Sequence, residues 1–328
     1  MKIKWLVAII FSFLCLLVFL PLNLDKPRLF YIEKGASITR ITQHLYAQNI
    51  SYSPMIAKWF FRGVSWFSPL QSGEYALQPG MNLFSLARLL VNGERVQHSI
   101  TFLPGHALSQ ISNRIQDAKS LLAPINYDQL LNDIEKIPIE QKFAHSSLEG
   151  LLFPDTYSYE YSDHYKKILL RAHQQWKEKA QAIWLKEGIN SPYDSLYQAS
   201  IVASLIQKEA KTPKDKKLVS GVIQNRLHQH MPLQIDATVI YALGKRYHGK
   251  LSHADMRVES PYNTYNHRGL PPTPIALFTM EDLQAALHPA QHDFLYYVLS
   301  KNNSEHLFAN NYQAHRDNIR AVTRAGIK

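Results

Sequence analysis

The hydrophobic pattern of the chain opens with an uncharged run at residues 5–22, which follows the N-terminal Met-Lys-Ile-Lys. A run of this length can cross a bilayer as a helix. It ends in Leu-Val-Phe-Leu-Pro-Leu-Asn-Leu-Asp, which lacks the small residues of a signal-peptidase site. The pattern therefore favours an uncleaved transmembrane signal anchor over residues 1–24, with a cleaved signal peptide as the alternative.

The charges beside this run predict its orientation. Lys2 and Lys4 precede it and favour a cytoplasmic N-terminus, whereas Lys26 and Arg28 follow it and weaken that signal. We expect a single-pass membrane protein whose remaining chain lies outside the cytoplasm. The single cysteine, Cys15, lies within the run, so no intrachain disulfide can form.

Three segments beyond this run share one spacing of hydrophobic positions. Each begins with a glycine and places apolar residues three, six and ten positions later, on one face of a short helix. An extended stretch precedes each glycine, and a cap position follows it. The glycines are Gly35, Gly80 and Gly105; the stretches are 29–33, 73–77 and 97–103; the caps are Ser37, Asn82 and Ala107. Unless the agreement is chance, each segment predicts a strand, a turn and a helix, and such small units should pack on one another.

This spacing resembles LysM-type modules, which bind the N-acetylated sugars of cell-wall glycans. Residues 25–146 are accordingly expected to form a LysM-like glycan-binding region that ends in a polar, helical connector at 121–142. The aromatic side chains of this region would either stack on sugar rings or belong to a core. They are Phe30, Tyr31, Trp59, Phe60, Phe61, Trp66 and Phe67.

The texture changes after residue 148, where long amphipathic helices alternate with loops rich in proline and glycine. Helices are predicted at 164–185, 196–210, 218–228, 281–287 and 312–324, with paired strands at 294–299 and 306–308. A proline-rich loop is predicted at 256–274. We therefore assign the chain to the α+β class, with a transmembrane helix, strand and helix modules, and a mixed, helix-rich α+β domain at 147–328.

The formal net charge of +10 over 328 residues indicates an anionic partner. No nucleic-acid-binding module is recognisable, and an extracytoplasmic chain rarely meets nucleic acid. An acidic lipid or a carboxylate-bearing cell-wall glycan is the expected partner. The densest basic cluster consists of Lys208, Lys211, Lys214, Lys216 and Lys217.

Glu209 is the strongest candidate for chemistry. Within the predicted helix at 196–210 it shares one face with Val202 and Leu205, so its carboxylate extends an apolar stripe. Removing a carboxylate from water raises its pKa. A carboxylic acid that stays protonated near neutral pH is what cleavage of a glycosidic bond requires. The alternative is a solvated glutamate beside Lys208 at the end of the helix.

Signals for other kinds of chemistry are weak. Two histidine pairs, His228 with His230 and His288 with His292, do not form an H-E-x-x-H zinc motif, and Pro289 interrupts the second pair. The sequence also lacks a G-x-S-x-G elbow and a P-loop. We therefore expect neither a metal site nor a cofactor.

Five ordered blocks of the second half resemble the YceG-like (MltG) family of endolytic murein transglycosylases. The first two, which are similar to EGxxFPDTY and ASIVEKEA, are LEGLLFPDTY at 148–157 and ASLIQKEA at 203–210. The third resembles NRL…LQSDPTVIY and joins VIQNRL at 222–227 to PLQIDATVIY at 232–241. The last two resemble ESPYNTY and GLPPGPI and are ESPYNTY at 259–265 and GLPPTPI at 269–275.

The resemblance implies a membrane-anchored enzyme that cleaves the β-1,4 bond between MurNAc and GlcNAc within peptidoglycan strands during cell wall assembly. By that resemblance, Glu209 is the catalytic acid and residues 147–328 are the catalytic domain. Gln207 stands where the family has glutamate and Ala237 where it has proline, and neither position replaces the acid. The resemblance also suggests contact with peptidoglycan synthases.

A lytic transglycosylase needs a single catalytic carboxyl group. That group protonates the bridging oxygen and then takes a proton from the C6 hydroxyl of the same sugar, so that a 1,6-anhydro end forms without water. Polar neighbours must stabilise positive charge at the anomeric carbon. Candidate substrate-binding residues in the matched blocks are Asn225, Gln234, Asp236, Tyr262, Asn263 and Tyr265.

Other interpretations stay open on the sequence alone. A glycoside hydrolase of the same substrate would use Asp236 as a second carboxylate and leave a reducing sugar. A scaffold would bind glycan strands without cutting them. Among the candidates, Asp236 would alternatively cap a helix that starts near Thr238, and the asparagines and tyrosines would alternatively hydrogen-bond within the fold. Glu149 and Asp155 are expected to be structural.

Overall fold

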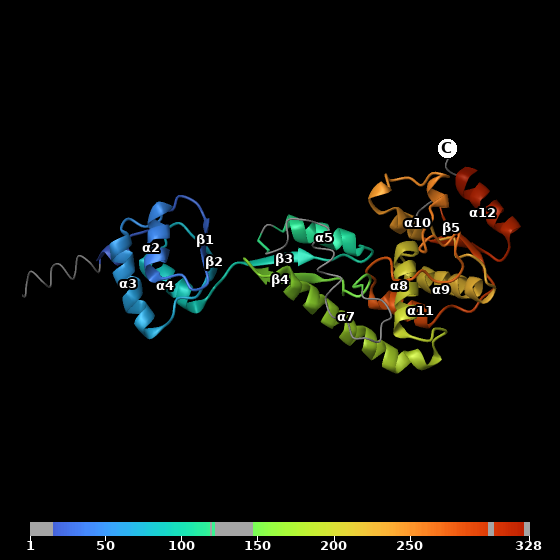
Figure 1. Cartoon of the computed structure of the whole chain (residues 1–328), viewed down its shortest axis with the longest axis horizontal. Helices are drawn as coiled ribbons and strands as arrows, with labels where there is room; N and C mark the ends of the chain where they lie inside the picture. The colour runs from blue at the N-terminus through green and yellow to red at the C-terminus, as the bar shows by residue number, and fades with distance from the viewer. Residues whose placement is uncertain (1–15, 119, 122–146, 301–304, 325–328) are drawn as a thin grey trace, which may run out of the picture. The chain divides into compact units, whose positions relative to one another are not determined.

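The chain is described by a computed structural model at residues 16–118, 120–121, 147–300 and 305–324. It divides into two compact units, which Figure 1 shows. Unit 1 comprises Met1–Ser99 with Ser158–Asp163, and unit 2 comprises Ile100–Tyr157 with His164–Lys328. Helices dominate both units, and the strands described form two-stranded sheets. The chain is therefore α+β, as its hydrophobic pattern predicts.

Unit 1 is built around one antiparallel strand pair. β1 (Arg28–Ile32) pairs with β2 (Gly73–Leu77), and the chain between them forms α2 (Ile38–Ala47) and α3 (Pro54–Phe67). α4 (Leu83–Asn92) follows β2 and packs against β2 and α3. Because apolar residues line one face of the sheet and the inner faces of the helices, these elements enclose a single core.

The predicted order of strand, glycine turn and helix is confirmed for all three repeats. Gly35, Gly80 and Gly105 have φ angles of 79°, 84° and 81°, which residues with a Cβ atom rarely adopt. Ser37 and Asn82 cap the helices that follow by accepting backbone hydrogen bonds, as their side chains predict. The repeated glycines therefore mark real chain reversals.

The third repeat departs from the expectation that all three pack on one another. β3 (Gln97–Thr101) pairs with β4 (Thr156–Glu160) instead of joining the β1–β2 pair. Its helix, α5 (Leu108–Asp117), belongs to unit 2. The local spacing thus identifies each repeat correctly but does not determine which element the repeat packs against.

Unit 2 is organised around α8, which packs against α9 and α11. Its further helices and strands with their bounds are α7 (Tyr165–Glu187), α8 (Leu196–Glu209), α9 (Pro213–His228), α10 (Asp236–Leu243), α11 (Met280–Leu287), β5 (Tyr296–Leu299), β6 (His306–Ala309) and α12 (Tyr312–Arg324). Short 3-10 turns occupy Gly188–Asn190, Gly244–Arg246 and Asp255–Arg257. α8 is buried along most of its length, so it forms the middle of the core (Figure 1).

The helices and the strand pair predicted in this half are all confirmed, with one notable difference in bounds. α9 begins earlier than predicted, at Pro213, because Thr212 caps it and proline fits the first turn of a helix. β5 and β6 pair antiparallel, as predicted. The loop predicted at 256–274 is confirmed, apart from the 3-10 turn at its start.

Among the described residues, no helix is long and apolar enough to span a membrane. Most of the predicted span at 5–22 falls on residues outside that description, as does the predicted connector from residue 122 onward. Pro21 pairs with Asn82 in an isolated bridge, and Leu22 is buried in the core of unit 1. Val18 also packs against this core, so the described residues contact unit 1 from about Val18 onward.

Candidate active site

A pocket of about 400 Å³ in unit 2 brings together residues that are far apart in the sequence. Four of the predicted site residues line it: Glu209, Gln234, Asp236 and Tyr265. The remaining lining residues are Arg226, Leu233, Tyr296, Tyr297, Tyr312 and His315. The pocket thus lies where α8 ends and α10 begins, beside β5 and α12.

Glu209 is the last residue of α8, which places its carboxyl group at the border between the core and the pocket. The helix starts at the Ser195 cap and is buried almost throughout as far as Ile206. It ends directly after Glu209 because Ala210 adopts an extended conformation. The C-terminal end of a helix is the negative end of its dipole, so ionisation of a carboxyl group is disfavoured there.

Burial raises the pKa of Glu209 from 4.5 to about 7. The Tyr297 hydroxyl opposes this shift by stabilising the ionised form, and the negative charge of Asp236 adds to it. Lys208 opposes it weakly, since its ammonium group is exposed and donates to the Gly105 carbonyl at 3.2 Å. The carboxyl group is therefore not simply solvated, and it can give or take a proton near neutral pH.

Tyr297 connects Glu209 to the β5–β6 hairpin. Its hydroxyl donates to Oε2 of Glu209 at 3.1 Å. Its ring packs edge-on against His306, with ring centroids 5.4 Å apart and an interplanar angle of 89°. The His306 backbone N–H donates to Oδ2 of Asp215 at 3.0 Å, and its Nδ1 lies 2.9 Å from the same oxygen. Burial, then the charge of Glu209, raises the pKa of Tyr297, so the hydroxyl stays protonated.

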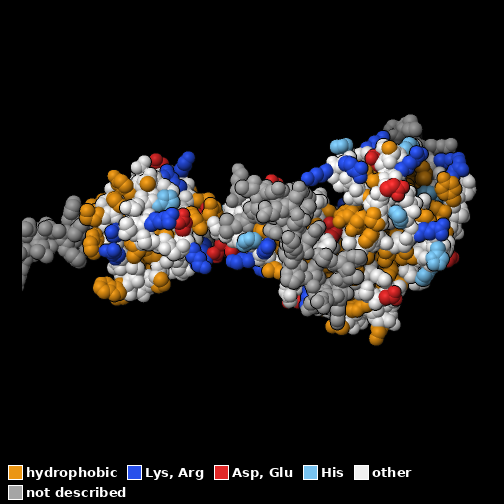
Figure 2. Space-filling model, in the orientation of Figure 1, with side chains coloured by type: hydrophobic (Ala, Val, Ile, Leu, Met, Phe, Trp, Pro, Cys, Tyr) orange, Lys and Arg blue, Asp and Glu red, His pale blue; other side chains and the backbone are white. Residues whose placement is uncertain are grey.

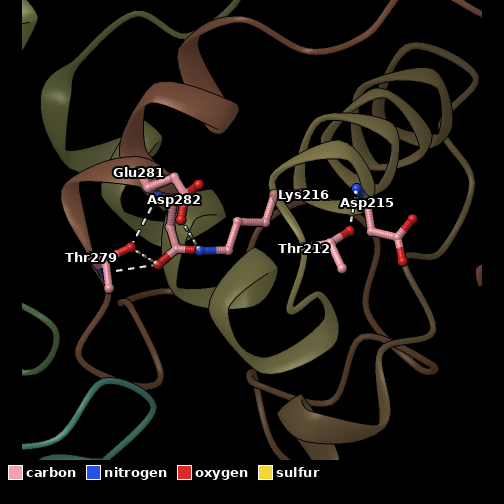
Figure 3. Close-up of polar contacts among 6 residues, drawn as sticks. All are labelled: Thr212, Asp215, Lys216, Thr279, Glu281 and Asp282. Carbon is pink, nitrogen blue, oxygen red and sulfur yellow. Dashed lines mark hydrogen bonds and ion pairs between the residues drawn. The ribbon is translucent and has the colours of Figure 1, made fainter. Parts of the chain in front are cut away.

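A largely buried polar cluster connects α9 to α11. Figure 3 shows Lys216 extending from α9 to two carboxylates on α11, while Asp215 points the opposite way. The Lys216 ammonium lies 2.8 Å from Glu281 and 3.1 Å from Asp282. Asp282 also accepts from the Thr279 hydroxyl at 2.6 Å. Lys216 therefore does not belong to a solvated basic face, although the sequence groups it with the surrounding lysines.

Arg226 holds together the backbone segments that border the pocket. Its Nε donates to the Leu295 carbonyl at 2.7 Å, and Nη1 donates to the Leu233 carbonyl at 2.8 Å. Nη1 also reaches Oε1 of Gln234 at 3.3 Å. The guanidinium group lies over the ring of Tyr296, 5.2 Å from its centroid. These contacts connect α9, β5 and the segment before α10.

Asp236 is the first residue of α10 and is held by Tyr265, whose hydroxyl donates to Oδ1 at 2.5 Å. Ile235 occupies the N-cap position, so the alternative in which Asp236 caps the helix is wrong. Gln234 precedes this turn with a φ angle of 52°, a conformation rarely adopted by residues other than glycine. Its backbone N–H donates to the Thr264 carbonyl at 3.1 Å. A strained backbone at a pocket is typical of functional sites.

Three predicted substrate-binding residues do not line this pocket. Asn225 donates to the carbonyls of His292 and Phe294, at 2.7 and 3.0 Å. The Tyr262 hydroxyl lies 3.1 Å from the hydroxyl oxygen of Thr273. Asn263 is fully buried, and it donates to the carbonyls of Met256 and Val258 at 3.1 and 2.9 Å. The structure thus gives these three side chains contacts within the fold.

Five polar or aromatic side chains that line the pocket are not among the sequence candidates: Arg226, Tyr296, Tyr297, Tyr312 and His315. Arg226 lies within a matched block, next to the candidate Asn225, so that block is a sequence signal for Arg226 as well. The other four follow the last matched block. Two adjacent tyrosines in a short predicted strand are the signal there, but only the fold brings them to Glu209.

Glu149 is a second carboxyl group with a raised pKa, and it lies away from this pocket. Its two oxygens accept from the N–H of Leu108, at 3.0 and 3.1 Å, and Oε2 accepts from the Tyr241 hydroxyl at 3.0 Å. Burial raises its pKa to about 7. Since Leu108 is the first residue of α5, Glu149 satisfies the amino end of that helix.

The neighbouring Gly150 explains part of the first matched block. It has a φ angle of 72°, and a Cβ atom there would overlap the ring of Pro274, in the fifth block.

Within the described residues, no group of three or more histidine, cysteine, aspartate or glutamate side chains is arranged to hold a metal ion.

Comparisons with known proteins agree on one family. The YceG-like family matches residues 30–321. An endolytic murein transglycosylase of Bacillus subtilis is 31% identical to the chain over 299 residues, which are 87% of this chain and 81% of that protein. Endolytic murein transglycosylases of two Streptococcus pneumoniae strains are 27% identical over 317 residues, 88% of this chain but 57% of theirs.

A solved structure gives the same result. The 2.6 Å crystal structure of a YceG-like protein of Listeria monocytogenes superposes with a TM-score of 0.58 at 26% sequence identity. The match covers 89% of this chain and 99% of that one. Since the family extends over most of the chain, both in sequence and in structure, the chain belongs to the YceG-like family.

Proposed function

We propose that the chain is an endolytic lytic transglycosylase of peptidoglycan. It cleaves the β-1,4 bond between MurNAc and GlcNAc within a glycan strand and leaves a 1,6-anhydroMurNAc end. Membership of the YceG-like family and the names of the curated relatives support this activity. The observation that carries this proposal is the position of Glu209. Its carboxyl group lines a pocket, and the pKa of that group is about 7.

In the first step, protonated Glu209 donates its proton to the bridging oxygen. The bond between that oxygen and C1 of MurNAc breaks, and the GlcNAc residue leaves with a free 4-hydroxyl group. Positive charge develops at C1 of MurNAc. An acid whose pKa lies near working pH serves this step well, because a large fraction of the enzyme carries the proton and the proton is readily transferred.

In the second step, ionised Glu209 takes the proton from the C6 hydroxyl of MurNAc. The C6 oxygen bonds to C1, so the anhydro ring closes and the enzyme returns to its starting protonation state. No water enters the reaction. The Tyr297 hydroxyl supports this cycle, because its hydrogen bond to Oε2 stabilises Glu209 while the carboxylate is ionised.

Asp236 and Tyr265 are proposed to act on the developing charge. A carboxylate that lines the same pocket stabilises positive charge at the anomeric carbon. Tyr265 holds that carboxylate at 2.5 Å and so fixes its direction. We also propose Gln234 as a substrate contact, since it lines the pocket beside them. Asn225, Tyr262 and Asn263 are proposed to shape the site from outside the pocket.

One competing function has a specific observation in its favour. Asp236 lines the same pocket as Glu209, which is the arrangement a two-carboxylate hydrolase of the same strands would need. The two mechanisms leave different ends: the hydrolase adds water and gives a reducing sugar, and the transglycosylase gives the anhydro sugar. Mass spectrometry distinguishes them, because the products differ by one water.

We further propose that the uncharged N-terminal run anchors the chain in the cell inner membrane with the two units in the periplasm. The uncharged sequence of that run and the basic residues before it support the anchor. Unit 1 is proposed to bind glycan in a LysM-like manner. It has a groove of about 340 Å³ that β1 and α2 line, including Tyr31, Arg40 and His44. Contact with peptidoglycan synthases is proposed on the resemblance alone.

The test of the proposed activity is analysis of muropeptides after incubation of the full chain with intact glycan strands. The wild-type chain should produce internal cuts with 1,6-anhydroMurNAc ends, and Glu209→Gln should produce none while it still folds. Reducing ends would support the hydrolase instead. If wild-type chain binds strands and cuts none under any condition in which it is folded, the scaffold is the correct function.

A further inference from the structure

Helix α3 of unit 1 exposes an aromatic stripe that the core does not explain. Met55, Trp59, Arg62 and Trp66 follow one another at intervals of four, three and four residues, which is one face of a helix. Met55 is 66% exposed, Trp59 64% and Trp66 89%, and the adjacent Phe67 is 91% exposed. Figure 2 shows hydrophobic side chains standing out on the surface of unit 1, with lysine and arginine among them.

The opposite face of α3 packs against the core of unit 1. Ala57 and Phe61 are buried there, and Ile56, Phe60 and Val64 pack against the same core. The helix is therefore apolar on both sides, whereas a surface helix of a soluble domain carries polar residues on its outer face. Large exposed apolar patches of this kind mark a surface that something else covers.

The charge of α3 indicates what covers it. The helix contains Lys58 and Arg62 and no acidic residue. The guanidinium group of Arg62 lies 5.4 Å from the centroid of the Trp59 ring, so it covers part of that ring and keeps its charge at the surface. Tryptophan beside lysine and arginine is the composition of helices that lie in the headgroup region of an anionic bilayer.

The way the chain enters unit 1 places the bilayer within reach. The uncharged run leads directly into the fold, because Pro21 already pairs with Asn82 at the start of α4. Phe19 packs on Phe84 of the same helix, with ring centroids 5.8 Å apart. Since α4 packs against α3, no linker separates the proposed anchor from the neighbourhood of the stripe. One residue of extended chain spans only about 3.5 Å.

We propose that α3 lies on the lipid bilayer that holds the N-terminal run, with Trp59, Trp66 and Phe67 among the headgroups and Lys58 and Arg62 against lipid phosphates. This inference rests on the anchor within the proposed function. It gives unit 1 a second contact with the membrane and so fixes its orientation there. A glycan strand is the competing occupant, but the groove in unit 1 is lined by β1 and α2 and includes no residue of α3.

The test places a nitroxide label on the full chain in vesicles of phosphatidylethanolamine and phosphatidylglycerol. Cys15→Ser removes the single cysteine, and Met55→Cys or Phe67→Cys then supplies the label site. Lys34→Cys is the matched control, because Lys34 is exposed on the turn between β1 and α2. Collision rates are measured with oxygen, which concentrates in lipid, and with a nickel chelate, which stays in water.

We expect oxygen to dominate at positions 55 and 67 and the nickel chelate to dominate at position 34. Trp59→Gln with Trp66→Gln should lower the oxygen contact at position 55 several-fold and leave the control label unchanged. Nickel dominance at all three positions, in chain that resists a carbonate wash of the vesicles, would overturn the proposal for α3 alone. Removal of the chain by that wash would instead overturn the anchor, and with it the proposal.

A separate arm addresses the competing occupant. Purified glycan strands are added to the labelled vesicles in a Glu209→Gln background, which prevents cutting. The expected result is no change at positions 55 and 67, because lipid already covers them. A fall in nickel collisions at these two positions after glycan addition would identify α3 as a glycan surface and contradict the proposal.

Discussion

Unit 2 contains two glutamates whose pKa values are both raised to about 7 by burial, and their surroundings differ in one decisive way. Glu149 is enclosed by the core, with its oxygens accepting from the first N–H of α5 and from the Tyr241 hydroxyl. Glu209 faces the pocket and accepts from Tyr297. One carboxyl group is committed to the fold, and the other remains accessible to a ligand.

This comparison shows that a raised pKa does not by itself identify a catalytic acid. Burial of a carboxyl group raises its pKa whether the group joins two helices or transfers a proton. What distinguishes Glu209 is access, together with Asp236 and Tyr265 on the same wall of the pocket.

Glu209→Gln should lower the rate of anhydro-product formation by about 10³-fold, since general acid and base catalysis contributes about 10²- to 10⁴-fold and one group performs both roles here. Glutamine keeps the size of the side chain and loses the proton. Muropeptide analysis measures the rate. Glu149→Gln is the matched control and should retain most of the activity. An equal loss of activity in both variants would contradict the assignment of Glu209 as catalytic and Glu149 as structural.

Glu149 should make the folded chain less stable as the pH rises. Its folded pKa of about 7 lies above the ordinary 4.5, so the folded state binds more protons than the unfolded state between these values. The contribution of Glu149 to the free energy of unfolding should therefore be greatest below about pH 4.5 and should fall as the pH rises to about 7. The full difference is about 3 kcal/mol for a shift of this size.

Urea unfolding of the full chain at a series of pH values measures this effect. Glu149→Gln should flatten the decline in unfolding free energy and leave the pH dependence of the lytic rate in place. The prediction would be contradicted if the free energy of unfolding of the wild-type chain, relative to that of Glu149→Gln, increased as the pH rose from 5 to 7. The Glu209→Gln variant serves as the comparison, since it should remove a separate part of the decline.

Tyr297→Phe should lower the lytic rate about tenfold, because one hydrogen bond to a charged group is worth about 1.5–3 kcal/mol. The hydroxyl stabilises ionised Glu209, so its removal should raise the pKa of that residue. Because Glu209 must be protonated when substrate binds, its pKa sets the alkaline limb of the pH profile of kcat/KM, and this limb should move to higher pH. Tyr296→Phe, one residue away on the same strand, is the control. A downward movement of the limb would contradict the assigned hydrogen bond.

Asp236→Asn should have the smallest of these effects on rate, a loss of several-fold, with anhydro ends still formed. Because the charge of Asp236 raises the pKa of Glu209, its removal should lower that pKa and move the alkaline limb of the profile to lower pH. The products are again read by mass spectrometry. Complete loss of cutting, with reducing ends in the wild-type products, would favour the two-carboxylate hydrolase.

The sequence predicts most of unit 2 correctly because its signals are local. The amphipathic spacing of α7, the apolar run of α8 and the caps beside them depend on neighbouring residues alone. The same local reasoning finds Glu209, since helical spacing aligns it with Val202 and Leu205. It also finds the strand pair that carries Tyr297, without indicating that this tyrosine reaches Glu209.

The features that the sequence does not predict depend on long-range contacts or on conflicting patterns. α3 is apolar on both faces, so no single amphipathic stripe identifies it. β4 is a short strand in which tyrosines alternate with polar residues, and only its pairing with β3 defines it. Asn225 and Asn263 were selected because their blocks resemble the family, yet a block resemblance does not distinguish a lining side chain from one that holds a loop.

The most direct test of the account is the titration of Glu209 in the folded chain. The infrared difference spectrum between the wild-type chain and Glu209→Gln isolates the carboxyl band of that residue from the band of Glu149 and all others. The band of the protonated acid should persist to about pH 7, half converted to carboxylate there. A midpoint near the ordinary 4.5 would mean that Glu209 is ionised whenever the substrate arrives, and would contradict its role as the proton donor.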